Sequence, residues 1–156
     1  MTVLVPMSST IYDQYLQAAV QAYADENIES RRWPAEGALQ RSRDDFDDSL
    51  PQGLATPDNY LFEIKSNDAG VTVGFLWFAL VEKNGIRSAF VYDVEIKAEF
   101  RRQGHAGAAF DALEPIVSEL GLNRIGLHVF KQNQAAQALY KKLGYKVTSI
   151  NMQKQL

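Results

Sequence analysis

The stretch 91–108 constrains the fold of this chain more than any other, and it reads VYDVEIKAEFRRQGHAGA. Apolar residues at Val91, Val94 and Ile96 predict a strand, and the arginines and glycines after it predict a turn that leads directly into a helix. The first N–H groups of a helix carry partial positive charge, glycine lets a ligand approach the backbone, and arginine adds forked donors. The stretch therefore predicts a phosphate-binding loop.

The composition limits the kinds of partner. A length of 156 residues predicts a single domain spanning 1–156. The net charge of −3 argues against a nucleic-acid partner, and zero cysteines with two histidines argue against a disulfide, a thiolate nucleophile or a metal site. The longest apolar run, 73–81, is well short of the ~20 residues that span a bilayer. Because the N-terminus also lacks a basic segment followed by an apolar one, we expect no membrane association and a cytoplasmic location.

Two helices are predicted in the first third of the chain. Ser9 or Thr10 is placed to cap the first, whose apolar positions repeat at helical spacing to near Glu29. Pro34 is placed to open the second, which should run to Leu50 and carry an acidic outer face.

Four strands are predicted in the first two thirds of the chain. They are placed at residues 3–5, 60–64, 71–81 and 91–97. A turn at 67–70 leads into the third of these, and Asn84-Gly85 is a strong hairpin signal between the third and the fourth. The third strand is apolar on both faces, so we expect helices above and below it.

The final third should contain two helices and two strands. The helix after the phosphate-binding loop should bend at Pro115 and end at Gly121, and strand 124–130 should lie parallel to the strand before the loop. Asn133 is placed to cap a last helix, and a final strand is predicted from Tyr145. The order β-α-α-β-β-β-α-β-α-β predicts an α/β fold with a mixed, mostly antiparallel sheet and helices on both faces. We expect a ligand at the carboxyl end of the strand before the loop.

Two blocks of residues carry a resemblance to a known family. The first is Arg101-Arg102-Gln103-Gly104-His105-Ala106, and the second is Leu127-His128-Val129 followed by Asn133, Ala136, Leu139-Tyr140 and Gly144-Tyr145. They are similar to the R/Q-x-x-G-x-G/A pyrophosphate loop and the L-x-V…N-x-x-A-x-x-L-Y-x-x-x-G-F/Y block of the GNAT superfamily of N-acetyltransferases, in the family's order and spacing. The departure is Ala106 where glycine is commoner. The resemblance covers nearly the whole chain and implies one splayed parallel strand pair.

The resemblance implies acetyl-CoA as the cofactor. The loop amides should bind the pyrophosphate with Arg101 and Arg102 supplying charge; the alternative is that these arginines are merely solvated. The backbone of Val94 and Ile96 should meet the pantetheine arm and hold the thioester oxygen as it gains charge, and His105 should support the loop. The expected cofactor-binding residues are Val94, Glu95, Ile96, Arg101, Arg102, Gln103, Gly104, His105, Ala106, Gly107, Asn133, Ala136 and Tyr140.

Three residues are candidates for catalysis. The resemblance implies that Tyr140 protonates the departing thiolate, and the alternative is a core tyrosine with a local hydrogen bond. Asp93 and Glu95 alternate with Val94 and should face away from it, so Glu95 is a candidate base or a solvated strand residue. His128 is the other candidate base, and a buried structural histidine is its alternative.

The acceptor is expected to be a small-molecule or peptide amine. Trp33, Tyr92 and Asp93 are the candidate contacts, and Trp77 is a further aromatic that core packing explains better. Direct attack in a ternary complex is expected, because no cysteine is present to carry the acetyl group. A coenzyme-A-binding sensor without turnover remains the alternative function. A homodimer is a further possibility, since members of the family often dimerise.

Overall fold

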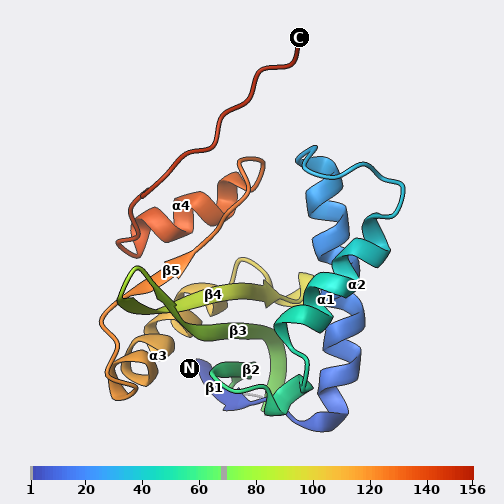
Figure 1. Ribbon diagram of the computed structural model, residues 1–156. Helices are drawn as coiled ribbons and strands as arrows, with labels where there is room; N and C mark the ends of the chain where they lie inside the picture. Colours follow the sequence, from blue (N-terminus) through green and yellow to red (C-terminus); the bar gives the residue numbers. More distant parts are fainter. Residues whose placement is uncertain (1, 68–69) are drawn as a thin grey trace.

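The structure is a computed structural model that describes residues 2–67 and 70–156 (Figure 1). Within these residues a five-stranded sheet carries helices on both of its faces. The elements are β1 (Thr2–Pro6), α1 (Ser9–Glu29), α2 (Ala38–Ser49), η1 (Gly53–Ala55), β2 (Asn59–Ser66), β3 (Val71–Lys83), β4 (Ile86–Ile96), η2 (Ala98–Phe100), α3 (His105–Glu119), β5 (Ile125–Leu127) and α4 (Gln134–Lys142). No helix of the described part is both long and apolar enough to cross a membrane.

The strands lie in the order β1-β2-β3-β4-β5, and only β4 and β5 run parallel. The predicted α/β class with a mixed, mostly antiparallel sheet is therefore confirmed. The parallel pairing extends only from Ala89 opposite Ile125 to Val91 opposite Leu127, while β4 continues to Ile96. The two strands thus separate after Val91, as the splayed pair implied by the resemblance requires.

Two hydrophobic cores hold the helices against the sheet. The core under α3 contains the buried residues Ile64, Leu76, Phe78, Val91, Phe110 and Leu113. The core under α1 and α2 contains Tyr15, Val20, Phe46, Leu61 and Trp77. Because alternate residues of β3 enter the two cores, this strand is covered on both faces, as its continuous apolar pattern predicted.

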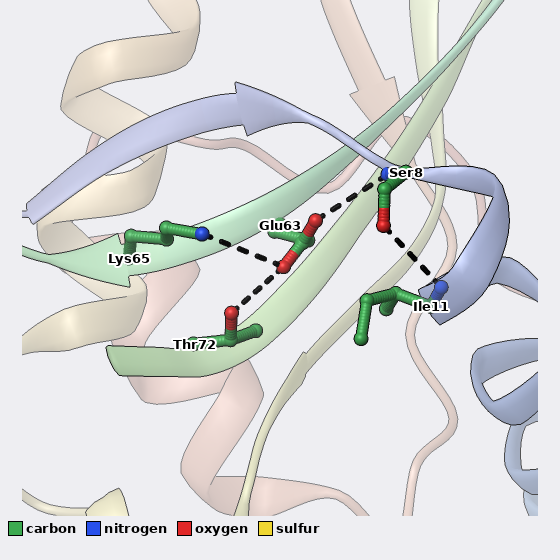
Figure 2. Close-up of polar contacts among 5 residues, drawn as sticks. All are labelled: Ser8, Ile11, Glu63, Lys65 and Thr72. Carbon is green, nitrogen blue, oxygen red and sulfur yellow. Dashed lines mark hydrogen bonds and ion pairs between the residues drawn. The ribbon is translucent and has the colours of Figure 1, made fainter. Parts of the chain in front are cut away.

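A buried carboxylate anchors the start of α1 to the sheet (Figure 2). Glu63 of β2 is only 5% exposed, accepts hydrogen bonds from the Ser8 amide (3.4 Å) and the Thr72 hydroxyl (2.7 Å), and lies 3.9 Å from Lys65 Nζ. Ser8 also caps α1, because its hydroxyl accepts from the Ile11 amide at 3.3 Å. A negative charge is favourable beside a helix N-terminus. The direction in which α1 crosses the sheet is therefore fixed at its first turn.

Most local predictions are confirmed. Asn84 and Gly85 both adopt positive φ (53° and 78°), which is the geometry of a tight hairpin between β3 and β4. The helix predicted after the loop runs through Pro115, and Gly121 follows it with a φ of 78°. Asn133 caps α4 as predicted. Of the turn predicted at 67–70, residues 68 and 69 lie outside the described part of the chain.

Three boundary predictions are wrong. The first helix is capped by Ser8, one residue before the predicted Ser9 or Thr10, and α2 starts at Ala38 rather than at Pro34, because Gly37 before it adopts a left-handed conformation (φ 76°). The parallel strand is shorter than predicted, since β5 covers only Ile125–Leu127.

The final strand predicted from Tyr145 is not formed. Residues 145–156 have no regular secondary structure and extend away from the sheet beyond α4 (Figure 1). A strand exists only where its N–H and C=O groups pair with a neighbouring strand, and the sheet of the described residues ends at β5 without this segment.

Candidate active site

The free edge of β4 is the centre of the candidate site. The Lys97 amide donates to the Val73 carbonyl at 2.8 Å, and Glu95 is paired with Phe75. Antiparallel pairing alternates, so the residues between these pairs turn their N–H and C=O groups away from β3. Val94 and Ile96 therefore present backbone groups toward the side from which β5 has diverged. The side chains of both pack against the α3 core, as predicted.

A β-bulge at Tyr92 determines which side chains share a face. Trp77 of β3 pairs with Asp93, whereas its neighbour Phe78 pairs with Val91, so Tyr92 is the extra residue. The bulge places Tyr92 and Asp93 on the same face as α1. Tyr92 is 48% exposed and stacks on the buried Trp77 ring with a centroid distance of 4.8 Å. Strict alternation would have placed Tyr92 on the opposite face.

Asp93 has an unusually high pKa for an aspartate. It is partly buried and accepts a hydrogen bond of 2.7 Å from the hydroxyl of Tyr15 on α1. Burial raises the pKa of Asp93 to about 7, and the negative charges of Glu95 and Glu26 act in the same direction. Hydrogen bonds from Tyr15 and from the Val94 backbone oppose the increase in pKa. Asp93 is therefore poised to exchange a proton near neutral pH.

The negative charges around Asp93 on β4 also affect ionisable groups on α1 and α4. Burial raises the pKa of Glu26, near the end of α1, and the charge of Glu95 raises it further. Burial raises the pKa of Tyr140 on α4 to about 12, with further contributions from Asp93 and Glu26. The Tyr140 ring packs edge-on against Phe110 of α3 at 5.4 Å. The hydroxyl of Tyr140 therefore stays protonated at neutral pH in the same electrostatic environment as the carboxylates.

The predicted phosphate-binding loop leads into α3. Gly104 before the helix has a φ of 83°, and open space surrounds the position where a Cβ would lie. The first hydrogen bond within the helix joins the Ala108 amide to the Gly104 carbonyl at 3.1 Å. The amides of residues 105–107 are therefore free of helical partners and available to an anion.

His105 joins this loop to the sheet. Its Nδ1 lies 3.0 Å from the Thr2 hydroxyl of β1, and its ring meets Phe100 edge-on at 6.5 Å. These contacts occupy one ring nitrogen and fix the ring at the first turn of α3. The supporting role of His105 in phosphate binding stays a prediction.

The two loop arginines have different surroundings. Arg101 Nε donates to the Ile96 carbonyl at 2.9 Å, so this side chain braces the end of β4 and takes one of its free acceptors. Arg102 is exposed and has a positive φ of 62°. Gln103, also exposed, reaches back to the Glu99 carbonyl at 3.4 Å. Both arginines precede the first turn of α3 in the chain by a few residues.

The side chain of Asn133 caps the first turn of α4 and keeps a donor for a further partner. The Asn133 side-chain carbonyl accepts from the Ala136 amide at 3.1 Å. This cap uses the side-chain oxygen of Asn133 and leaves its side-chain amide nitrogen available as a donor to a ligand. Ala136 and Tyr140 lie one turn apart on the same helix.

His128 follows β5, and Trp33 lies in the loop between α1 and α2. His128 is exposed, directly follows β5 and meets Phe130 edge-on at 4.9 Å. Partial burial lowers the pKa of His128, and Arg32 lowers it further. Trp33 packs edge-on against Tyr23 at 5.4 Å. Arg32 connects the α1–α2 loop with the segment after β5, where its guanidinium lies 5.7 Å from the Phe130 ring.

Two residues of the carboxylate cluster were not predicted from the sequence. Tyr15 was assigned only to the apolar face of α1, and Glu26 was not assigned a role. The one available signal was that a tyrosine at a buried helix position needs a partner for its hydroxyl. That partner, Asp93, is 78 residues away in the chain.

A parallel strand pair that separates beside a helix N-terminus is the arrangement that the resemblance implied for N-acetyltransferases. The model of the Acetyltransferase (GNAT) family matches residues 16–145, and the chain belongs to this family.

Bacterial N-acetyltransferases are similar to this chain over nearly its full length. The uncharacterized N-acetyltransferase YycN of Bacillus subtilis (strain 168) is 34% identical over 98% of this chain and 97% of its own length. The uncharacterized N-acetyltransferase YdgE of the same organism is 33% identical over 96% of this chain and 95% of its own. The crystal structure of YycN superposes with a TM-score of 0.94, covering 100% of this chain and 99% of that one at 33% identity. A putative acetyl transferase from Pyrococcus furiosus, at 22% identity, covers 100% of both chains with a TM-score of 0.72 and shares the fold.

Proposed function

We propose that residues 1–156 form one acetyl-CoA-dependent N-acetyltransferase domain that acetylates a primary amine by direct attack in a ternary complex. The observation that carries the proposal is the free edge of β4. This edge lies between a helix N-terminus with unpaired amides and a cluster of carboxylates in which burial raises the pKa of Asp93 and of Glu26. The first feature suits a pyrophosphate, and the second suits an amine that must lose a proton.

The residues present fit coenzyme A. The amides of 105–107, with Arg101 and Arg102, would hold the pyrophosphate, and the free backbone groups of Val94 and Ile96 would hold the pantetheine amides. The Asn133 side-chain amide nitrogen, together with the face of α4 that carries Ala136 and Tyr140, would complete the site. The loop itself would be shaped by Gln103, Gly104, His105 and Gly107. When bound, acetyl-CoA supplies the acetyl group as a thioester.

We assign the proton acceptor to Asp93. An ammonium group has to lose a proton before its nitrogen can attack, and a base is most effective when its pKa is close to the working pH. Asp93, with a pKa of about 7, meets this condition, and the charge of Glu95 helps to hold its pKa there. Glu95 and His128 are the competing bases, and the variants Glu95→Gln and His128→Gln separate the three.

We assign the proton donor to Tyr140. Burial and the nearby carboxylates keep its phenol protonated at neutral pH. The protonated phenol of Tyr140 would donate a proton to the sulfur of the departing thiolate as the C–S bond breaks. The free N–H groups of β4 stabilise charge on the thioester oxygen as the C–N bond forms.

The acceptor is proposed to be cationic and to carry an apolar portion. Glu26, Asp93 and Glu95 attract an ammonium group, and the exposed Tyr92 ring beside them offers an aromatic surface supported by Trp77. Trp33 lies farther along the α1–α2 loop, where it would contact a longer acceptor.

Two measurements test the proposal. Calorimetry with coenzyme A should detect binding that Arg101→Glu weakens by at least about tenfold, whereas the exposed Arg87→Glu at the β3–β4 hairpin should leave it unchanged. A thiol reagent should then report coenzyme A released with a panel of amines and peptides, without background from the protein, which has no cysteine.

The results also separate transfer from binding alone. Binding without thiol release on the whole panel would refute the transferase and favour a coenzyme-A-binding sensor. Affinity that Arg101→Glu does not change would refute the pyrophosphate assignment.

A further inference from the structure

The strands β4 and β5 lead to different kinds of side chain beyond the point where they separate. Val91 and Leu127 are the last residues that pair, so Asp93 lies two residues beyond the pairing on β4, and His128 lies one residue beyond it on the other arm. Paired strands are only about 4.8 Å apart. An aspartate and a histidine therefore stand on the two arms of one opening.

His128 and Asp93 also lie on the same face of the sheet. Leu127 packs against the α3 core, and successive residues of an extended chain point to opposite faces, so His128 points to the α1 side. Asp93 lies on that side too, since it accepts a hydrogen bond from Tyr15 of α1. His128 is exposed and thus accessible to a ligand.

Arg32 of the α1–α2 loop adds a positive charge beside His128. Its guanidinium lies 5.7 Å from the Phe130 ring, and the His128 ring meets the same ring edge-on at 4.9 Å. The charge of Arg32 contributes to the lowered pKa of His128, so the two groups interact electrostatically. Arg32 is exposed, and the salt bridge found among the described residues joins Lys65 with Glu63 instead. The charge of Arg32 is therefore available to a ligand.

Hydrogen bonds hold the loop that carries Arg32 close to the acidic part of the site. The Arg32 amide donates to the Asn27 carbonyl at 3.0 Å, and the Gln132 side chain donates to the carbonyl of the preceding residue, Glu26, at 3.3 Å. The charge of Glu26 in turn contributes to the raised pKa of Asp93. Arg32 and the carboxylates therefore border the same opening.

The chemistry of Arg32 and His128 suits a carboxylate. A guanidinium presents forked N–H donors that match the two oxygens of a carboxylate, and a neutral imidazole still donates one N–H. One carboxylate neutralises the single charge of Arg32. A doubly charged phosphate would be repelled more strongly by Glu26, Asp93 and Glu95.

We propose that the acceptor is a zwitterion of the amino-acid class, an amine that also carries a carboxylate, with its amine at Asp93 and its carboxylate held by Arg32 and His128. This inference rests on the transferase function proposed above and adds an anionic group to the acceptor described there. The carbon chain between the two groups would cross the opening, where the exposed Tyr92 ring offers an apolar surface. His128 then binds the substrate, and Asp93 remains the base.

The test compares amino acids with their own carboxamides, which keep the amine and the chain length but lack the negative charge. Glycine, β-alanine, 4-aminobutanoate and 6-aminohexanoate, each with its amide, are assayed by thiol release. We expect kcat/KM for the best acid to exceed that for its amide by at least about tenfold. Arg32→Gln should lower this acid-to-amide ratio by a similar factor. The ratio compares two substrates on one protein, so partial unfolding of a variant does not change it.

The matched control is Arg31→Gln, because Arg31 is the neighbouring exposed arginine of the same loop. Its acid-to-amide ratio should equal that of the wild type, and a decrease as large as in Arg32→Gln would overturn the inference. Amides that react as well as the acids throughout the series would also overturn it, while the transferase function would stand.

A different result would count against the transferase itself, namely no thiol release from any compound. Calorimetry of the same acids and amides on the complex with coenzyme A then tests the carboxylate site without turnover. The best acid should bind at least about tenfold more tightly than its amide in the wild type and lose this advantage in Arg32→Gln. Equal binding of acid and amide, or no binding of either at about 10 mM, would overturn the inference.

Discussion

Tyr15→Phe should move the pH dependence of the reaction while leaving the fold intact. The substitution removes only the hydroxyl that donates to Asp93 at 2.7 Å, and the remaining ring still packs against Phe75 at 5.2 Å. The hydrogen bond favours the ionised form of Asp93 and so lowers its pKa. Its loss must therefore raise the pKa of Asp93 above about 7.

The size of the effect follows from the strength of the bond. A hydrogen bond to a charged group contributes about 1.5–3 kcal/mol, which corresponds to about one to two pKa units at 1.36 kcal/mol per unit. Since the base form is the active form, the acidic limb of kcat/KM should move upward by that amount. At pH 7 the rate should fall by about five- to fiftyfold, and at high pH it should recover.

The assay is the pH profile of kcat/KM for acetyl-CoA and a responsive amine, compared with two other variants. Glu95→Gln removes a negative neighbour, so it should lower the pKa of Asp93 and shift the limb in the opposite direction. Tyr12→Phe, one turn earlier on α1, is the matched control and should leave the limb in place. An acidic limb that does not move in Tyr15→Phe, or that persists in Asp93→Asn, would refute Asp93 as the base.

Three further predictions concern the same site. Tyr140→Phe should lower kcat by about a hundredfold or more with little change in coenzyme A affinity by calorimetry, and an unchanged kcat would remove it as the donor. Gly74→Ala should destabilise the fold by about 1–3 kcal/mol in urea unfolding, because its Cβ would collide with the Glu95 carbonyl; a neutral result would show that β4 moves freely there. Asp93→Asn should gain stability over the wild type as pH rises from about 4 to 7, by at most about 4 kcal/mol, since a pKa raised in the folded state makes ionisation costly. A stability difference that stays constant from pH 4 to 8 would contradict this reading.

The loop, the hairpin and α4 were predictable because their signals are local. Asn84-Gly85 specifies a tight turn through two neighbouring residues, and Asn133 caps α4 through an amide three residues away. Glycine and arginine after a strand likewise indicated the loop before α3. These local elements need no knowledge of the rest of the chain.

The remaining parts depend on contacts that sequence patterns do not contain. The bulge at Tyr92 arises from the pairing of β4 with β3, and the sequence of β4 alone gives no sign of the extra residue. The Tyr15 hydroxyl finds Asp93 only because α1 crosses that face of the sheet. The last strand failed for the same reason: residues 145–156 have a strand-like composition, but a strand also needs a neighbour.

The position of α1 affects the pKa of Asp93, because α1 carries the Tyr15 hydroxyl that donates to this carboxylate. One end of the helix is fixed to the sheet through Ser8 and Glu63, and near the other end Gln132 donates to the Glu26 carbonyl at 3.3 Å. Between these anchors Tyr15 supplies the one side-chain hydrogen bond that favours the ionised form of Asp93, while burial and Glu95 favour the protonated form. The pKa of about 7 thus results from opposing effects of burial, neighbouring charges and the hydrogen bond from Tyr15 on Asp93. A small shift of α1 at either anchor would change that hydrogen bond although Asp93 itself does not move. The part of the arrangement that sequence patterns do not reveal is therefore the part that sets the pKa of Asp93.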